Sequence, residues 1–579
     1  MKSNYIKNWI LILFSILLFN SCSEDFLDRA PTAALDQEKT FGDIRLARQY
    51  QQGLYTSLIG GFYSMSGNPT NTSGYALEFI SDMDGHCMGS YFNTSCIDLL
   101  AGKFQTNSNE SVWEVENIWS NSYKFIRAIN IFLENYQKVP LNTDADKAEM
   151  NSMVGEAYFL RAHNYFELVK RWGGVPPVYK VLTVADNQKI PRASITASID
   201  SIVADCDRGA ALMNTQVSST QWLGRVTKGA ALGLKTRALL WGASPYWSSH
   251  GSGMKYEDAA KAALDVINLN VYSLMPKYKD VFMVNYNPEV IYFHNDVVHG
   301  TWQFMNFVPY PLGGWCNGDM LATQEFVDCY EIKNALGQYV PFDRNNPDHL
   351  ANMYNADRRD SRFKASVLYN GAKWQGLTCS YYVGGSFGPG YVNNYYTGYN
   401  FVKWLDESVR VGGLVGQGGS RQTNWIFLRY ADILLMYAEA QNQVGGPNSS
   451  AEGSTKTALW AINQVRERSG LSDLPSGISK EDFDVRLRNE RAVELVIEDQ
   501  HYFDLKRWGI GEVSQQPVHQ VIATKNSDGT FTYDFSQTTG PIRYQYPVTD
   551  QFDLYPIPVS EIIRNPTLVQ NPGWQDIMR

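Results

Sequence analysis

The sequence contains little cysteine and little histidine, with 7 Cys and 8 His among 579 residues. The cysteines form no Cys-x-x-Cys pair and the histidines lack zinc-ligand spacing, so no structural zinc is predicted. The chain also lacks the His-Glu-x-x-His, P-loop and dinucleotide-binding signatures. We therefore expect no metal and no cofactor, although Asp-rich turns leave a loop calcium open. Cys87 and Cys96 can pair across a loop in an oxidising compartment, and the sequence leaves their state open.

Positive charge is scarce as well. Lys and Arg total 50 against 59 Asp and Glu, which gives a net charge of −9. Because phosphate binding needs concentrated Lys and Arg, nucleic acid is not an expected partner. Aromatic residues, in contrast, are abundant, with 35 Tyr, 27 Phe and 15 Trp. Most are expected in the core of a large protein, and the remainder can form a stacking surface for planar or sugar-like ligands.

A short apolar run lies near the N-terminus. Lys2 and Lys7 precede apolar residues from Trp9 to Phe19, a stretch too short to span a bilayer but typical of an export signal. The run ends at Ser21 and Cys22, a pattern typical of bacterial lipoprotein cleavage sites, where the cysteine thiol is acylated. We predict a signal peptide at 1–21 and a lipid anchor on Cys22. An ordinary secretory signal with an incidental cysteine is the alternative.

Helical periodicity dominates the rest of the chain. Tyr158, Ala162 and Tyr165 recur at helical spacing, and Gly173-Gly174 ends that helix. A second apolar face runs from Phe427 to the Gly445-Gly446 break. Similar faces predict helices near 42–60, 113–138, 195–213, 225–243, 256–268, 455–469 and 481–499.

Three stretches have a different composition, rich in Gly, Asn, Ser, Tyr and Trp with little helical period: 62–112, 297–320 and 366–424. Long ordered loops are uncommon unless they are functional, so a binding site is expected there. No linker divides the helical segments on either side of these loops. We therefore predict one domain over residues 22–579.

Several motifs follow one another along the chain in a recognisable order. They cover residues 156–162, 224–231, 428–440, 489–495, 504–509, 555–558 and 570–574. Together they resemble the SusD/RagB family of outer-membrane nutrient-binding lipoproteins. The resemblance implies a mostly α fold, with a tetratricopeptide-like scaffold of helix pairs and long irregular loops on one face.

The resemblance also implies a function without catalysis. A surface-exposed, lipid-anchored protein of the outer membrane would bind oligo- or polysaccharide and deliver it to a TonB-dependent, SusC-like transporter. Non-glycan cargo such as peptides is the first alternative. A secreted glycoside hydrolase is a distant one, because the many carboxylates leave catalytic pairs open.

Sugar recognition needs aromatic platforms together with Asp, Asn, Arg or Gln side chains for directional hydrogen bonds. Three stretches combine these residue types, and turn formation or burial is the alternative role at each position. The candidate glycan-binding residues are Asp82, Asp84, Tyr91, Phe92, Asn93, Trp302, Trp315, Trp374, Tyr382 and Tyr395.

Charged residues within the motifs are predicted to have a structural role. They fall inside or at the ends of expected helices, where buried charges must be paired. These residues are Arg161, Arg429, Asp432, Glu439, Glu490, Arg491, Glu494, Asp504 and Arg507.

Overall fold

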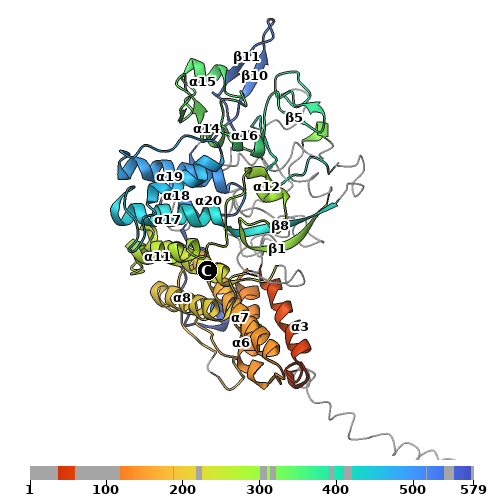
Figure 1. Ribbon diagram of the computed structural model, residues 1–579, viewed down its shortest axis with the longest axis vertical. Helices are drawn as coiled ribbons and strands as arrows, with labels where there is room; N and C mark the ends of the chain where they lie inside the picture. The colour runs from red at the N-terminus through yellow and green to blue at the C-terminus, as the bar shows by residue number, and fades with distance from the viewer. Residues whose placement is uncertain are drawn as a thin grey trace, which may run out of the picture.

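The computed structural model describes residues 37–58, 118–186, 188–216, 224–299, 309–312, 321–389, 397–409, 420–516, 518–539 and 553–575. Within these ranges the protein is mostly α-helical, with a few short strands (Figure 1). This confirms the predicted fold class.

The helices are α3 (Ile44–Leu54), α6 (Ile118–Asn135), α7 (Asp144–Trp172), α8 (Ile195–Leu212), α9 (Lys228–Ala243), α10 (Pro245–Ser249), α11 (Tyr256–Ile267), α12 (Tyr278–Met283), α14 (Gln324–Asp328), α15 (Pro347–Ala351), α16 (Ser361–Ser366), α17 (Tyr430–Gly445), α18 (Ala458–Arg468), α19 (Lys480–Leu495), α20 (His501–Trp508) and α22 (Val559–Arg564). The strands are β1 (Val290–His299), β2 (Ile332–Lys333), β3 (Tyr339–Val340), β4 (Val367–Leu368), β5 (Lys373–Trp374), β6 (Leu377–Thr378), β7 (Asn400–Phe401), β8 (Ser420–Arg429), β9 (Val518–His519), β10 (Ile522–Lys525), β11 (Phe531–Asp534) and β12 (Thr538–Thr539).

Helices α7 and α8 approach closely where Gly155 and Gly209 face each other. A Cβ atom on Gly155 of α7 would lie 3.0 Å from the Gly209 carbonyl oxygen of α8 and 2.7 Å from Met213 Cγ. Helix α7 begins with a capping box, in which Thr143 accepts from the backbone of Asp146 and Asp146 accepts in return. It ends at Gly173, whose φ of 75° suits glycine.

Strands β1 and β8 form a long antiparallel ribbon that lies beside α12 (Figure 1). The helix predicted from Phe427 to the Gly445-Gly446 break is present as α17, but its predicted start is wrong, because β8 continues to Arg429 and α17 begins at Tyr430. Pairing with β1 decides the conformation here: Phe427 stacks on Tyr292 with ring centroids 5.5 Å apart. Such cross-strand aromatic pairs stabilise a ribbon and override local helical spacing.

Two large hydrophobic cores lie on either side of the segments that contain Arg429 and Glu494. The first core includes Leu435 and Leu487 with the paired helices. The second includes Trp404, Trp425 and Val493 with the elements around α12, α14 and α16. Helix α19 contributes to both cores, so the charged residues between its two apolar ends lie at the junction.

The β10–β11 hairpin projects from the end of the molecule beyond α15 and α16 (Figure 1). Its register pairs Ala523 with Tyr533 and Lys525 with Phe531. Because side chains alternate along a strand, these four residues share one face of the hairpin.

Candidate functional site

Two of the predicted glycan-binding residues, Trp374 and Tyr382, lie in the described part of the chain. The other candidates lie outside the described residues: Asp82, Asp84, Tyr91, Phe92, Asn93, Trp302, Trp315 and Tyr395. Cys22, predicted as the lipid anchor, also lies outside them.

Trp374 lies at the end of β5, beside a two-residue turn. Gln375 and Gly376 form that turn with φ of 50° and 83°, as a type I′ hairpin requires. The Trp374 side chain is only 7% exposed and belongs to the second core. Lys279 Nζ lies 6.0 Å from the centre of its ring. The role of Trp374 in ligand binding stays a prediction, and most of the surface of its ring is already covered by protein.

Tyr382 is half-buried and lies beside the projecting hairpin, where its ring begins a row of aromatic rings. Its ring centroid lies 5.4 Å from that of Phe531. Phe531 lies 6.4 Å from Tyr533, and Tyr533 lies 6.4 Å from Phe535, with interplanar angles of 27° and 26°. We call these four residues the hairpin row. Phe531 and Tyr533 of β11, and Phe535 just after it, were not predicted from the sequence, although the alternation Phe-Thr-Tyr-Asp-Phe is a strand signal that indicates them.

The junction between the two cores holds a network of buried ion pairs. Arg429 Nη1 lies 2.7 Å from Glu289 and 2.6 Å from Glu494, and Arg429 Nε lies 2.8 Å from Glu498. Equal numbers of cations and carboxylates make up the network. They are Arg362, Lys403, Arg429, Arg466, Arg468 and Arg486 with Glu289, Glu331, Asp360, Glu490, Glu494 and Glu498.

The cations of the network keep Glu494 ionised although it is buried. Burial alone raises the pKa of Glu494, but the positive charges of Arg468 and Arg429 outweigh it and hold the pKa well below its usual range. The backbone nearby is also held in place. Lys403 Nζ donates to the carbonyl oxygen of Val496, and Trp404 Nε1 donates to that of Ile497. The network therefore fixes the turn between α19 and α20 against the second core.

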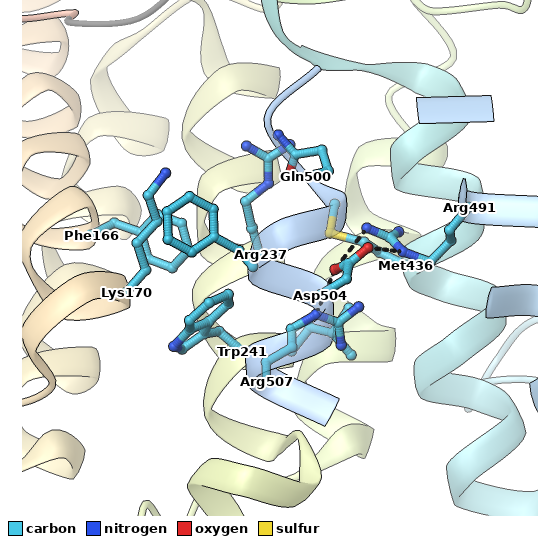
Figure 2. A pocket seen from close by; sticks show the side chains of 11 residues that line it. Phe166, Lys170, Arg237, Trp241, Met436, Arg491, Gln500, Asp504 and Arg507 are labelled. Carbon is cyan, nitrogen blue, oxygen red and sulfur yellow. Dashed lines mark hydrogen bonds and ion pairs between the residues drawn. The ribbon is translucent and has the colours of Figure 1, made fainter. Parts of the chain in front are cut away.

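A second group of buried charges surrounds a small pocket between α7, α9, α17, α19 and α20 (Figure 2). Its volume of about 20 Å³ is enough for a water molecule but not for a sugar. Asp504 binds both Arg491 and Arg507, each at 2.8 Å. Arg507 in turn lies 2.5 Å from Glu439. The pocket is thus a structural element in which each of these charges has a partner.

The predicted structural role of the motif charges is confirmed. Arg161, outside both groups, lies 2.7 Å from Asp205 and joins α7 to α8. Asp432 joins α17 to α9 and α19, because it binds both Arg237 and Arg491. The remaining motif charges belong to the network and the pocket described above.

Residues 384–388 read Gly-Gly-Ser-Phe-Gly, which matches the Gly-x-Ser-x-Gly letters of a hydrolase nucleophile elbow. That elbow needs a sharp turn from a strand into a helix. Here the segment forms consecutive turns and folds back on itself: Gly385 N–H donates to Tyr382 O, and Phe387 N–H donates to Ser380 O. The match is therefore one of letters and not of geometry.

Neither a metal site nor a membrane-spanning helix is found in the described ranges. No group of three or more His, Cys, Asp or Glu side chains there is placed to hold a metal ion. None of the helices described is both long and apolar enough to cross a membrane.

Comparison with known proteins agrees with this arrangement. A family profile described as "SusD family" matches residues 288–574, and one described as "Starch-binding associating with outer membrane" matches residues 25–240. SusD-like protein P25 of Formosa agariphila is 24% identical over 527 residues, which cover 87% of this chain and 90% of the relative.

Solved structures show the same likeness. A SusD-like protein from Bacteroides fragilis superposes with a TM-score of 0.75 at 26% identity, over 94% of this chain and 100% of the other. A SusD-like carbohydrate-binding protein from the same species superposes with a TM-score of 0.69 at 22% identity, over 92% and 100% of the two chains.

The mostly helical fold and the two profile matches thus define a tetratricopeptide-like helical protein of the SusD type. The chain belongs to the SusD-like family.

Proposed function

We propose that this protein binds oligo- or polysaccharide at the cell surface and delivers it to a TonB-dependent, SusC-like transporter, without catalysing a reaction. The observation that carries the proposal is that two SusD-type profiles, one of them starch-binding, together match most of the chain. A solved relative with the same fold is described as carbohydrate-binding.

The chemistry of the described residues supports binding without catalysis. The buried carboxylates at the core junction and around the pocket are all held by cations, so they are unsuited to act as acid and base on a substrate. The pocket they surround is too small for a sugar ring. The Gly-x-Ser-x-Gly letters lack the required geometry.

A polysaccharide-binding screen tests the proposal. The soluble protein without residues 1–22 would be run through native gels containing starch and other plant, microbial and host polysaccharides. Retardation by one polymer class supports the proposal and names the ligand. No retardation by any polymer, with binding of peptides instead, would contradict glycan binding and favour the peptide alternative.

Anchoring and domain organisation complete the proposal. We infer that residues 1–21 are a signal peptide, that Cys22 carries the lipid, and that residues 22–579 form one domain. A Cys22→Ala variant should leave the detergent phase and enter the aqueous phase on phase partitioning. Unchanged partitioning of this variant would contradict a lipid on Cys22. Co-purification with a SusC-like barrel from the native membrane tests the transporter partner.

A further inference from the structure

We propose that the hairpin row of Tyr382, Phe531, Tyr533 and Phe535 is a glycan contact, along which an extended sugar chain lies with its apolar faces against the rings. The inference rests on the proposed function and adds to it a defined surface. It also adds a requirement for a chain of several sugars, because the ring of Tyr382 and the three rings that begin with Phe531 of β11 follow one another in a row.

The geometry of the row suits a linear chain. Consecutive ring centroids lie 5.4, 6.4 and 6.4 Å apart, which is close to the repeat of sugar rings in an extended glycan. Each of the four residues is half-buried, so part of each side chain remains accessible. The surrounding core aromatics differ in this respect: Tyr330 is 0%, Phe363 is 1% and Tyr399 is 1% exposed.

Hydrogen-bonding groups border the row at both ends. Lys525 is exposed on the same face of the hairpin, and its Nζ lies 5.8 Å from the centre of the Tyr382 ring. At the other end, the guanidinium carbon of Arg344 lies 5.6 Å from the centre of the Phe535 ring, and this guanidinium also pairs with two carboxylates of α14. Flat apolar faces bordered by polar donors are the combination that a hydroxyl-rich ring with an apolar side requires.

Contacts with neighbouring aromatic residues hold Tyr533 of the row in place. Tyr533 meets Tyr354 edge to face at 5.7 Å, and Tyr354 is hydrogen-bonded to Tyr399 with 3.0 Å between the hydroxyl oxygens. The Tyr399 hydroxyl then donates to Gln324 Oε1 at 2.6 Å. A buried hydrogen-bonded chain thus fixes one ring of the row before ligand arrives, which reduces the entropy lost on binding.

If Phe531 had only a packing role, any apolar side chain of similar volume would serve, whereas ligand stacking needs a flat ring. Phe531→Leu separates the two, because leucine keeps apolar contact with Tyr382 but removes the stacking face. The matched control is Thr524→Ala, an exposed position on the same hairpin whose side chain lies on the opposite face. Melting temperatures of both variants should match that of the wild type.

The test measures dissociation constants by calorimetry for oligomers of increasing length, prepared from the polysaccharide that retards the wild-type protein. We expect Phe531→Leu to weaken binding of the longer oligomers roughly 3- to 10-fold, as for the loss of one aromatic contact. Binding of the disaccharide should not change, and Thr524→Ala should bind every oligomer like the wild type.

Hydrogen–deuterium exchange gives a second measurement that needs no variant. The longest oligomer should slow amide exchange within residues 522–535 of the wild-type protein. If Phe531→Leu binds every oligomer like the wild type and exchange in 522–535 is unchanged, the inference is wrong while the proposed function stands. If the wild type binds no glycan at all, the proposed function itself fails.

Discussion

Arg429 and Glu494 form an ion pair at the junction of the two hydrophobic cores, with 2.6 Å between Nη1 and Oε1 and both side chains completely buried. Arg429 ends β8 and Glu494 lies in the last turn of α19. The pair therefore joins the β1–β8 ribbon to the helices that carry the family motifs. Because Glu289 and Glu498 bind the same guanidinium, three carboxylates share this cation.

Arg429→Met should therefore destabilise the protein strongly. The substitution keeps a side chain of similar length but leaves the buried network with one more carboxylate than cations, and breaking a buried ion pair in this way typically costs about 3–5 kcal/mol. Urea unfolding followed by circular dichroism measures the loss.

The control for that variant is Arg45→Met. Arg45 pairs with Asp43 at the surface, where solvent screens the interaction, so its loss should change the unfolding midpoint little. Equal midpoints for Arg429→Met and the wild type would show that the junction network adds nothing to stability.

Acid should destabilise the protein through His163. This residue is 1% exposed among Phe159, Tyr292 and Phe427, and neither ring nitrogen has a hydrogen-bond partner within the described ranges. Burial lowers the pKa of His163 from 6.5 to about 4. Between about pH 6.5 and pH 4, His163 is therefore protonated in the unfolded chain but neutral in the folded protein. The free energy of unfolding accordingly decreases as the pH falls through this range.

The size of this effect follows from the pKa difference. It corresponds to a loss of about 3 kcal/mol across that range. His163→Phe removes the titrating group and keeps an aromatic ring, so its unfolding free energy should fall less over the same range. Parallel pH profiles of the variant and the wild type would rule out His163 as the cause.

Two glycine-to-alanine variants should have opposite effects. Gly155→Ala places a Cβ 2.7 Å from Met213 Cγ where α7 meets α8, and such overpacking typically costs about 1–3 kcal/mol. Gly53 lies in α3 with nothing within 4 Å of its Cβ position, so Gly53→Ala should stabilise by about 0.5–1 kcal/mol. Thermal unfolding measures the stability of the two variants. If Gly53→Ala also destabilises the protein, the close α7–α8 approach does not explain the loss in Gly155→Ala.

Trp374 should matter more for stability than its predicted ligand role suggests. Because the side chain lies in the second core, Trp374→Ala should destabilise by about 3–5 kcal/mol. Urea unfolding with and without saturating glycan distinguishes the roles. Unchanged stability of the unliganded variant, combined with lost glycan affinity, would identify a binding residue instead of a core residue.

The sequence by itself determined the helical scaffold, because helix formation depends on periodicity and end signals that are local. The face containing Tyr158, Ala162 and Tyr165 and the stop at Gly173 predicted a helix that the structure contains as the C-terminal half of α7. The order of the motifs also determined the family. It further predicted that motif charges such as Arg429 and Glu494 would be paired, since an unpaired buried charge is too costly.

Only the tertiary structure decided which groups meet. Arg429 and Glu289 are 140 positions apart, and no local pattern identifies such partners. Phe427 has helical spacing but lies in a strand, because β8 pairs with β1 on both sides of it and its ring stacks on Tyr292. The hairpin row likewise needed Tyr382 to be placed beside Phe531, a contact between distant segments made when the chain packs.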